Sequence, residues 1–141
     1  MSEADADLAN LRRAFEAFND RFETLRRDGI EAYYAEFYDD DAVVEAAESF
    51  PAPMRHQGLD GFRAYFEEAY GPFEGVRFDV ESIERHGERL MARTRVRGRF
   101  IGDPTELEVR VAIVYDMRGG RIARALVYRS PERALADLHG A

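Results

Sequence analysis

The chain has 141 residues, a formal net charge of −8 and a hydrophobic content of 45%. This length suits one compact domain with its own core, and the composition excludes general disorder. The absence of cysteine excludes disulfides and thiolate metal sites, while the absence of lysine excludes a Walker-type phosphate loop and a lysine Schiff base. The acidic balance argues against nucleic acid or an anionic membrane as the main partner.

Membrane insertion and export are also not expected from the sequence. No run of apolar residues approaches the length of about 18 that a transmembrane helix requires. The acidic N-terminal segment lacks the basic and apolar regions of a signal peptide. We therefore expect a cytoplasmic protein with no membrane partner and no nucleic-acid partner.

The first half of the chain has mainly helical patterns. Apolar residues recur every three or four positions over 5–27, which predicts a long amphipathic helix that ends at Gly29. A short aromatic helix is expected at 29–38, and the acidic run 39–41 suits a turn. Further along the chain we expect a strand at 42–47, an extended segment at 54–57 and a helix at 59–70.

The second half of the chain has the alternation typical of strands, which are expected at 75–85, 89–101, 106–117 and 121–129. The glycines at 119–120 predict a tight hairpin turn, and the segment 102–104 predicts a looser one. Ser130 followed by Pro131 predicts the start of a final short helix. Helices first and an antiparallel sheet second indicate an α+β fold with the helices on one face of a curved sheet.

Several phrases along almost the whole chain resemble the SnoaL-like branch of the NTF2-like superfamily, which includes ketosteroid isomerases and polyketide cyclases. The matching phrases are RAFEAFN at 13–19, QGLDGF at 57–62, RVRGR at 95–99, VYDMRGGRI at 114–122, VYR at 127–129 and ERAL at 132–135. The resemblance implies a cone in which N-terminal helices and a strongly curved antiparallel sheet enclose one pocket. It also implies a single domain over 1–141, with flexible tails at 1–5 and 139–141.

The resemblance does not extend to the chemical groups of the ketosteroid isomerases. Alignment to that group puts Ala46 at the position of the catalytic base and Ala112 at the position of the acidic oxyanion donor. The tyrosine of the first helix falls on or near Phe15 or Phe18. Isomerisation by that mechanism is therefore not expected. The arginine and aspartates of limonene-epoxide hydrolases are not matched either, because Arg95 stands where the second aspartate would follow Arg93.

Four arginines alternate along one predicted strand, at 93, 95, 97 and 99, so they share one face of it. A hairpin centred near 102–103 puts Arg97 opposite Glu108, Arg99 opposite Glu106 and Arg93 opposite Ala112. One interpretation is a ladder of ion pairs on a solvated face, and we favour it. The other puts Arg93 in the pocket as an oxyanion partner. The position of Ala112 in the isomerase alignment favours the second interpretation, so the two remain in conflict.

Two further residues are candidates for acid–base chemistry. Glu48 shares a strand face with the vacant base position at Ala46 if the strand stays regular, and a carboxylate in an apolar pocket could act as a base. His56 precedes the third helix and could act as an acid or base near neutral pH. For each residue the alternative is a solvated position without a role. The three scattered histidines make a weak case for a metal, and we expect no cofactor and no metal.

Aromatic side chains on the predicted helices converge on the sheet and are candidates to line the pocket. With the two alanines above, the expected ligand-binding residues are Phe15, Phe18, Tyr33, Phe37, Phe62, Tyr65, Phe66, Ala46 and Ala112. Together with Glu48, His56 and Arg93 as catalytic candidates, they suggest a protein that binds or transforms a small apolar carbonyl-bearing or polycyclic compound. The alternative is a non-catalytic binding or dimerisation domain on the same scaffold.

A homodimer is also expected. Val109, Val111, Ile113 and Tyr115 alternate with charged residues on one strand, and both faces of that strand cannot belong to the core. If the charged face lines the pocket, the apolar face needs a partner, and in the related family such sheets often pair across their outer faces.

Overall fold

A computed structural model of the chain describes residues 2–46 and 54–139. The helices α1 (Glu3–Thr24) and α2 (Ile30–Phe37) precede the first strand. The helix α3 (Gly58–Tyr70) lies between the second and third strands, and α4 (Pro131–His139) follows the last strand. A five-residue π-helical turn, η1 (Leu25–Gly29), joins α1 to α2. The strands are β1 (Tyr38–Ala46), β2 (Met54–Gln57), β3 (Phe73–His86), β4 (Arg89–Phe100), β5 (Leu107–Arg118) and β6 (Arg121–Tyr128). The predicted α+β class is confirmed.

The long first helix forms because its sequence supplies both a cap and one apolar face. The Ser2 side chain accepts a hydrogen bond from the backbone N–H of Asp5, which satisfies one of the free amides at the helix start. Residues 3–5, which were expected in a tail, therefore form the first turn of α1. The side chains of Leu11, Phe15 and Phe18 are buried on the face that meets the sheet.

The six strands form one curved sheet in the order β2-β1-β6-β5-β4-β3. Four neighbouring pairs are antiparallel, as predicted, but β1 and β6 run parallel. The expected turn at 39–41 is wrong, because β1 begins at Tyr38 and these aspartates continue the strand. Their side chains are solvated or half-buried, so a strand at this place does not bury their charge.

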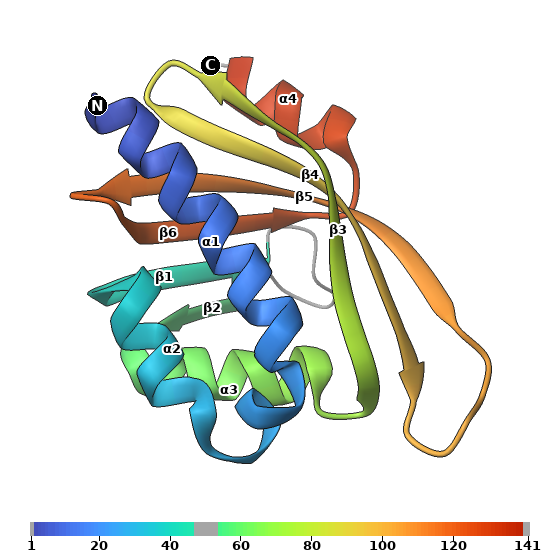
Figure 1. The fold of residues 1–141 in the computed structure, drawn as a ribbon. Helices are drawn as coiled ribbons and strands as arrows, with labels where there is room; N and C mark the ends of the chain where they lie inside the picture. The colour runs from blue at the N-terminus through green and yellow to red at the C-terminus, as the bar shows by residue number, and fades with distance from the viewer. Residues whose placement is uncertain (1, 47–53, 140–141) are drawn as a thin grey trace.

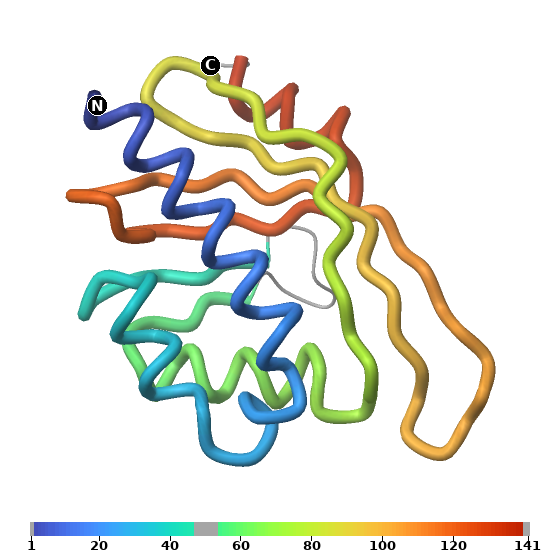
Figure 2. Tube along the Cα trace, viewed as in Figure 1, coloured from blue at the N-terminus to red at the C-terminus, as the bar shows by residue number. Residues whose placement is uncertain are grey.

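The sheet has an inner face, covered by α1, α2 and α3, and an outer face, partly covered by α4 (Figure 1). The main core lies on the inner face and includes Leu90 and Ala92 of β4 with Ile113 and Tyr115 of β5. A smaller core lies beneath α4 and consists of Met91, Ala112, Val114, Tyr128 and Ala134. Because successive side chains of a strand point to opposite faces of the sheet, neighbouring residues of β4 and of β5 belong to different cores. Figure 2 shows both ends of the chain at the same end of the sheet.

The arginine ladder lies on the outer face. The predicted register is confirmed at two positions, because Arg97 lies opposite Glu108 and Arg93 lies opposite Ala112. The four arginines form ion pairs with acidic side chains of β3: Arg93 with Glu84, Arg95 with Glu81, Arg97 with Asp79 and Arg99 with Glu74. The solvated ladder is therefore the correct interpretation. The premise of the expected dimer, a charged face toward the pocket, does not hold.

A half-buried polar contact docks α1 against the edge of the sheet at β3. The Asn19 side chain accepts a hydrogen bond from the backbone N–H of Phe78 at 2.7 Å and donates one to the carbonyl of the same residue at 2.8 Å. The amide thus pairs with β3 as a neighbouring strand would. This contact pairs the backbone of the β3 edge at Phe78 and holds α1 across the inner face.

The described residues contain neither a membrane-spanning helix nor a cluster of metal-binding side chains. None of the helices in 2–46 and 54–139 is both long enough and apolar enough to cross a membrane. Within the same ranges, no three His, Asp or Glu side chains gather in a way that could hold a metal ion.

Candidate functional site

Two adjoining cavities lie on the inner face, between the helices and the sheet. The inner cavity is small, with a volume of about 50 Å³, and lies beneath α1 and α3. Its described lining is almost entirely apolar and aromatic, and includes five tyrosines: Tyr33, Tyr38, Tyr65, Tyr70 and Tyr115. Ile113 and Val127 lie between this cavity and the outer one and contribute to both.

The outer cavity is larger, about 320 Å³, and its lining includes residues from both strands of the long β4–β5 hairpin. Val96, Leu107, Val109 and Val111 form its wall on the sheet. Tyr65, Tyr70 and Phe78 also line both cavities, so the two spaces are treated as one site with an inner and an outer part.

The buried tyrosines supply the polar groups of this site. The Tyr33 hydroxyl is already used, because it donates to the carbonyl of Ala14 at 2.9 Å. Burial raises the pKa of Tyr38, Tyr65, Tyr70 and Tyr115 above the ordinary tyrosine value. These four phenols therefore stay neutral near pH 7, and each keeps a proton to donate.

Two of these phenols lie side by side. The rings of Tyr65 and Tyr70 are 6.1 Å apart and nearly perpendicular. Burial is the main cause that raises the pKa of each, and each side chain also shifts the pKa of the other. Both residues line both cavities, so their hydroxyl groups are the candidates to meet a ligand there.

Five of the predicted ligand-binding residues do lie at the site: Phe15, Phe18, Tyr33, Phe62 and Tyr65 line the inner cavity. Phe37 and Phe66 are buried in the same core but are not among the described lining residues. Ala46 lies opposite Val127 in the β1–β6 pair, next to the site, and is also not among its lining. Ala112 lies on the outer face, where it packs beneath α4.

The three catalytic candidates are not brought together around the cavities. Arg93 lies on the outer face, and its guanidinium donates to the carboxylate of Glu84. The interaction lowers the pKa of Glu84, mainly through this hydrogen bond. Glu48 falls outside the described residues, and its role as a base stays a prediction.

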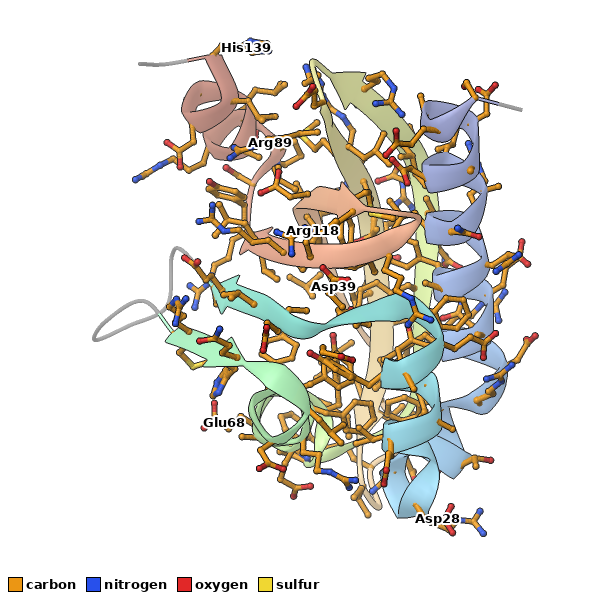
Figure 3. The ribbon with its side chains drawn as sticks, turned by 90° about the vertical axis from the view of Figure 1, so that its left-hand side faces the viewer. Asp28, Asp39, Glu68, Arg89, Arg118 and His139 are labelled. Carbon is orange, nitrogen blue, oxygen red and sulfur yellow. The ribbon has the colours of Figure 1, made fainter. Side chains whose placement is uncertain are left out.

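His56 lies beside the site but not in it. Its ring is 6.0 Å from the ring of Tyr65, and its Nε2 lies 3.3 Å from the Oε2 of Glu68. These two atoms are close enough for an ion pair when the histidine is protonated, but they are not aligned for a hydrogen bond. Glu68 lies on the solvent side of α3 (Figure 3), and His56 is not among the described lining residues of either cavity.

Three tyrosines of the site were missed by the sequence interpretation. Tyr38 was assigned to the end of the second helix and Tyr70 to a helix end before Gly71, and neither was considered for the pocket. Tyr115 was assigned to an apolar face in need of a partner. Its alternation with Ile113 was the available signal, because both residues share the inner face with the aromatic side chains of α1.

The comparisons with known proteins agree with this architecture. Bal32a from a soil-derived mobile gene cassette has a TM-score of 0.72 and 19% identity, covering 97% of this chain and 98% of its own. A proposed SnoaL-like polyketide cyclase from Jannaschia sp. CCS1 has a TM-score of 0.70 and 13% identity, covering 100% and 97%. TerC, co-crystallised with polyporic acid, has a TM-score of 0.69 and 15% identity, covering 94% and 97%. At these identities the likeness shows the fold.

No curated protein matches this chain. The family model of the SnoaL-like domain matches residues 11–125, which include most of α1, the described lining of both cavities except Val127, and most of the sheet. With a match over most of its length and the fold of that family, the chain belongs to the SnoaL-like domain family.

Proposed function

We propose that this protein binds a small, uncharged, largely apolar molecule that carries a carbonyl or hydroxyl oxygen. The observation that carries the proposal is the group of neutral tyrosines that line an otherwise apolar cavity. An apolar cavity with a few convergent hydrogen-bond donors is the usual design of a small-molecule site. The donors would orient the oxygen of the ligand, and the aromatic walls would cover its apolar body.

The polarity of the site favours an uncharged ligand. The described lining of the inner cavity contains no carboxylate, imidazole or guanidinium. In the outer cavity the charged lining residues are Arg97 and Glu108, whose side chains form an ion pair with each other at 3.3 Å. A charged ligand would lose its hydration without gaining an opposite charge, which is costly.

The size of the site favours a molecule of a few fused or linked rings. The outer cavity lies within the range of about 300–1,000 Å³ that is usual for ligand pockets. The inner cavity holds little more than one small polar group. A ligand would therefore place its body in the outer cavity and its oxygen near Tyr65 and Tyr70, which line both. The relatives support such a role, since one of them was co-crystallised with polyporic acid.

Binding of a matched pair of probes tests the proposal. Fluorenone and fluorene share their ring system, but only fluorenone has a carbonyl oxygen. We expect fluorenone to bind more tightly, and Tyr65→Phe to weaken it by about 2–12-fold, because one net hydrogen bond contributes about 0.5–1.5 kcal/mol. The affinity for fluorene should stay unchanged in this variant. Fluorescence quenching or calorimetric titration would measure both.

The control for this experiment is Tyr34→Phe. Tyr34 is a buried tyrosine of the same core, but its hydroxyl donates to the carbonyl of Asp40 and it does not line either cavity in the described structure. This variant should bind both probes like the wild type. Equal affinities of the wild type for the two probes, or equal losses in both variants, would contradict the proposed role of Tyr65.

Catalysis is a separate proposal with its own test. We expect little or no proton exchange on a 3-keto-Δ5 steroid, because Ala46 cannot act as a base and a missing general base removes a factor of about 10²–10⁴ in rate. The exchange is followed by NMR in deuterated buffer, for the wild type and Glu48→Gln. Robust exchange in both proteins would refute this expectation. Exchange in the wild type that is lost in Glu48→Gln would identify Glu48 as the base.

A further inference from the structure

The strand β5 is longer than its neighbour β6 at one end. Its pairing with β6 begins at Ala112 opposite Tyr128, whereas its pairing with β4 already begins at Leu107 opposite Gly98. Residues 107–111 therefore have a strand on one side only within the described structure, and Figure 2 shows this hairpin extending beyond the rest of the sheet. We propose that this free edge, residues 107–111, pairs antiparallel with the same edge of a second copy of the chain.

The exposure of this edge argues for a partner. Leu107 and Val109 are 41% and 53% exposed, which is unusual for large apolar side chains in a strand. Unpaired backbone N–H and C=O groups along such an edge form a template for another strand. At β3, the opposite side of the sheet, Asn19 of α1 bonds the backbone instead. At 107–111 the described side-chain bond to the backbone comes from β4 itself, where the Thr94 hydroxyl donates to the carbonyl of Val111 at 2.9 Å. No described hydrogen bond to this backbone comes from an element other than β4.

The edge sequence Leu-Glu-Val-Arg-Val is complementary to itself in the antiparallel direction. A twofold axis at Val109 places Val109 opposite its own copy and Leu107 opposite the partner's Val111. It also places Glu108 opposite the partner's Arg110, and Arg110 opposite the partner's Glu108. The period of two puts both charge pairs on one face of the joined sheet and all apolar contacts on the other.

Within one chain, the charge of Arg110 is not balanced by the residue that faces it on β4. Arg110 lies directly opposite Arg95 of β4, so like charges face each other. Arg95 has Glu81 as an ion-pair partner, but among the described residues no ion pair includes Arg110. A glutamate from a second copy would supply the missing opposite charge. Like charges directly opposite in a ladder are destabilising, and opposite charges stabilise it.

The proposed contact also affects the outer cavity. Leu107, Val109 and Val111 form part of its wall, and their exposed side chains would pack against the same side chains of the partner. The partner would thus cover part of the cavity that is open in one chain. This interface differs from the pairing across outer faces that the sequence suggested, because the outer face carries the charged ladder and α4.

The test is the mass in solution, measured by sedimentation from about 5 to 500 µM, since short interfaces give weak and concentration-dependent association. We expect the wild type to approach twice the chain mass of 16.2 kDa at high concentration. Val109→Lys should abolish this, because two ammonium groups would face each other at the axis. Ile101→Lys is the matched control: Ile101 is 55% exposed on the same hairpin but outside the pairing, so its association should stay unchanged.

A charge swap tests the register. Glu108→Arg and Arg110→Glu should each weaken association by about tenfold or more, because each places like charges opposite one another twice across the axis. The double variant Glu108→Arg/Arg110→Glu restores opposite charges at both contacts and should associate like the wild type. A wild type that stays at the mass of one chain overturns the proposal. Association that survives Val109→Lys, or a double variant no better than the single ones, overturns it as well.

Discussion

Replacing Phe18 by alanine is expected to lower the free energy of unfolding by about 3–5 kcal/mol. Phe18 is 6% exposed and lies at the centre of the aromatic core. Its ring centroid lies within 6.3 Å of those of five other aromatic side chains: Phe22, Tyr33, Phe66, Tyr70 and Phe78. Removal of the ring leaves a cavity that these rigid neighbours, held by three helices and β3, cannot fill. Urea or thermal unfolding followed by circular dichroism measures the effect.

Phe100→Ala is the matched control for this variant. The Phe100 ring stacks on Phe73 at 4.7 Å, but the residue is 48% exposed and lies on the projecting hairpin. Its loss should cost about 1 kcal/mol or less, because little of its surface is removed from water on folding. Equal losses for the two variants would show that the aromatic cluster under α1 is not the centre of the core.

Alkaline solution is expected to unfold the protein, and ionisation of its tyrosines should accompany the unfolding. The pKa is raised, first of all by burial, for all seven tyrosines of the chain: Tyr33, Tyr34, Tyr38, Tyr65, Tyr70, Tyr115 and Tyr128. For Tyr128 on the outer face, burial and a hydrogen bond to Asp137 raise it to about 12. The unfolded chain titrates near the ordinary value of about 10.

The sign of this effect follows from the raised values. Below the unfolded pKa, both states keep their phenolic protons and stability is independent of these groups. As pH rises above about 10, the unfolded chain loses protons that the folded chain retains, so stability falls, by about 1.4 kcal/mol for each pKa unit of each group. Phenolate absorbance at 295 nm should therefore stay flat until pH exceeds about 10 and then rise together with the loss of ellipticity.

A titration in concentrated guanidinium chloride is the control for this experiment. All seven phenols should then ionise together near pH 10, because none is buried in the unfolded chain. A folded protein whose absorbance rises near pH 10 while its ellipticity remains constant would contradict the burial of the tyrosine cluster.

The local sequence determined most of the elements of this protein. The three- and four-residue spacing of Leu11, Phe15 and Phe18 has the period of a helix, and the helix is present. The glycines at 119–120 predicted the tight turn between β5 and β6, where both have positive φ. Even the register of β4 against β5 followed from the hairpin, since a short connection leaves few ways to align two strands.

Contacts between distant segments were decided only by the tertiary structure. The parallel pair of β1 and β6 joins residues about 80 positions apart, and nothing in the local pattern of either strand specifies that neighbour. The same limit applies to Tyr38, Tyr70 and Tyr115, which come from two strands and a helix end and meet only when α3 packs on the sheet.

The two faces of β4 show most clearly the difference between what the sequence determines and what the tertiary structure decides. The period of two determined that Arg93 and Arg97 share one face, but it does not state which face meets the helices. The three-dimensional fold decides this, because only it places the acidic side chains of β3 beside those arginines. Burial of the same guanidinium groups beneath α1 would remove them from water with no carboxylate to pair with, so the charged face turns outward and the apolar one forms the site.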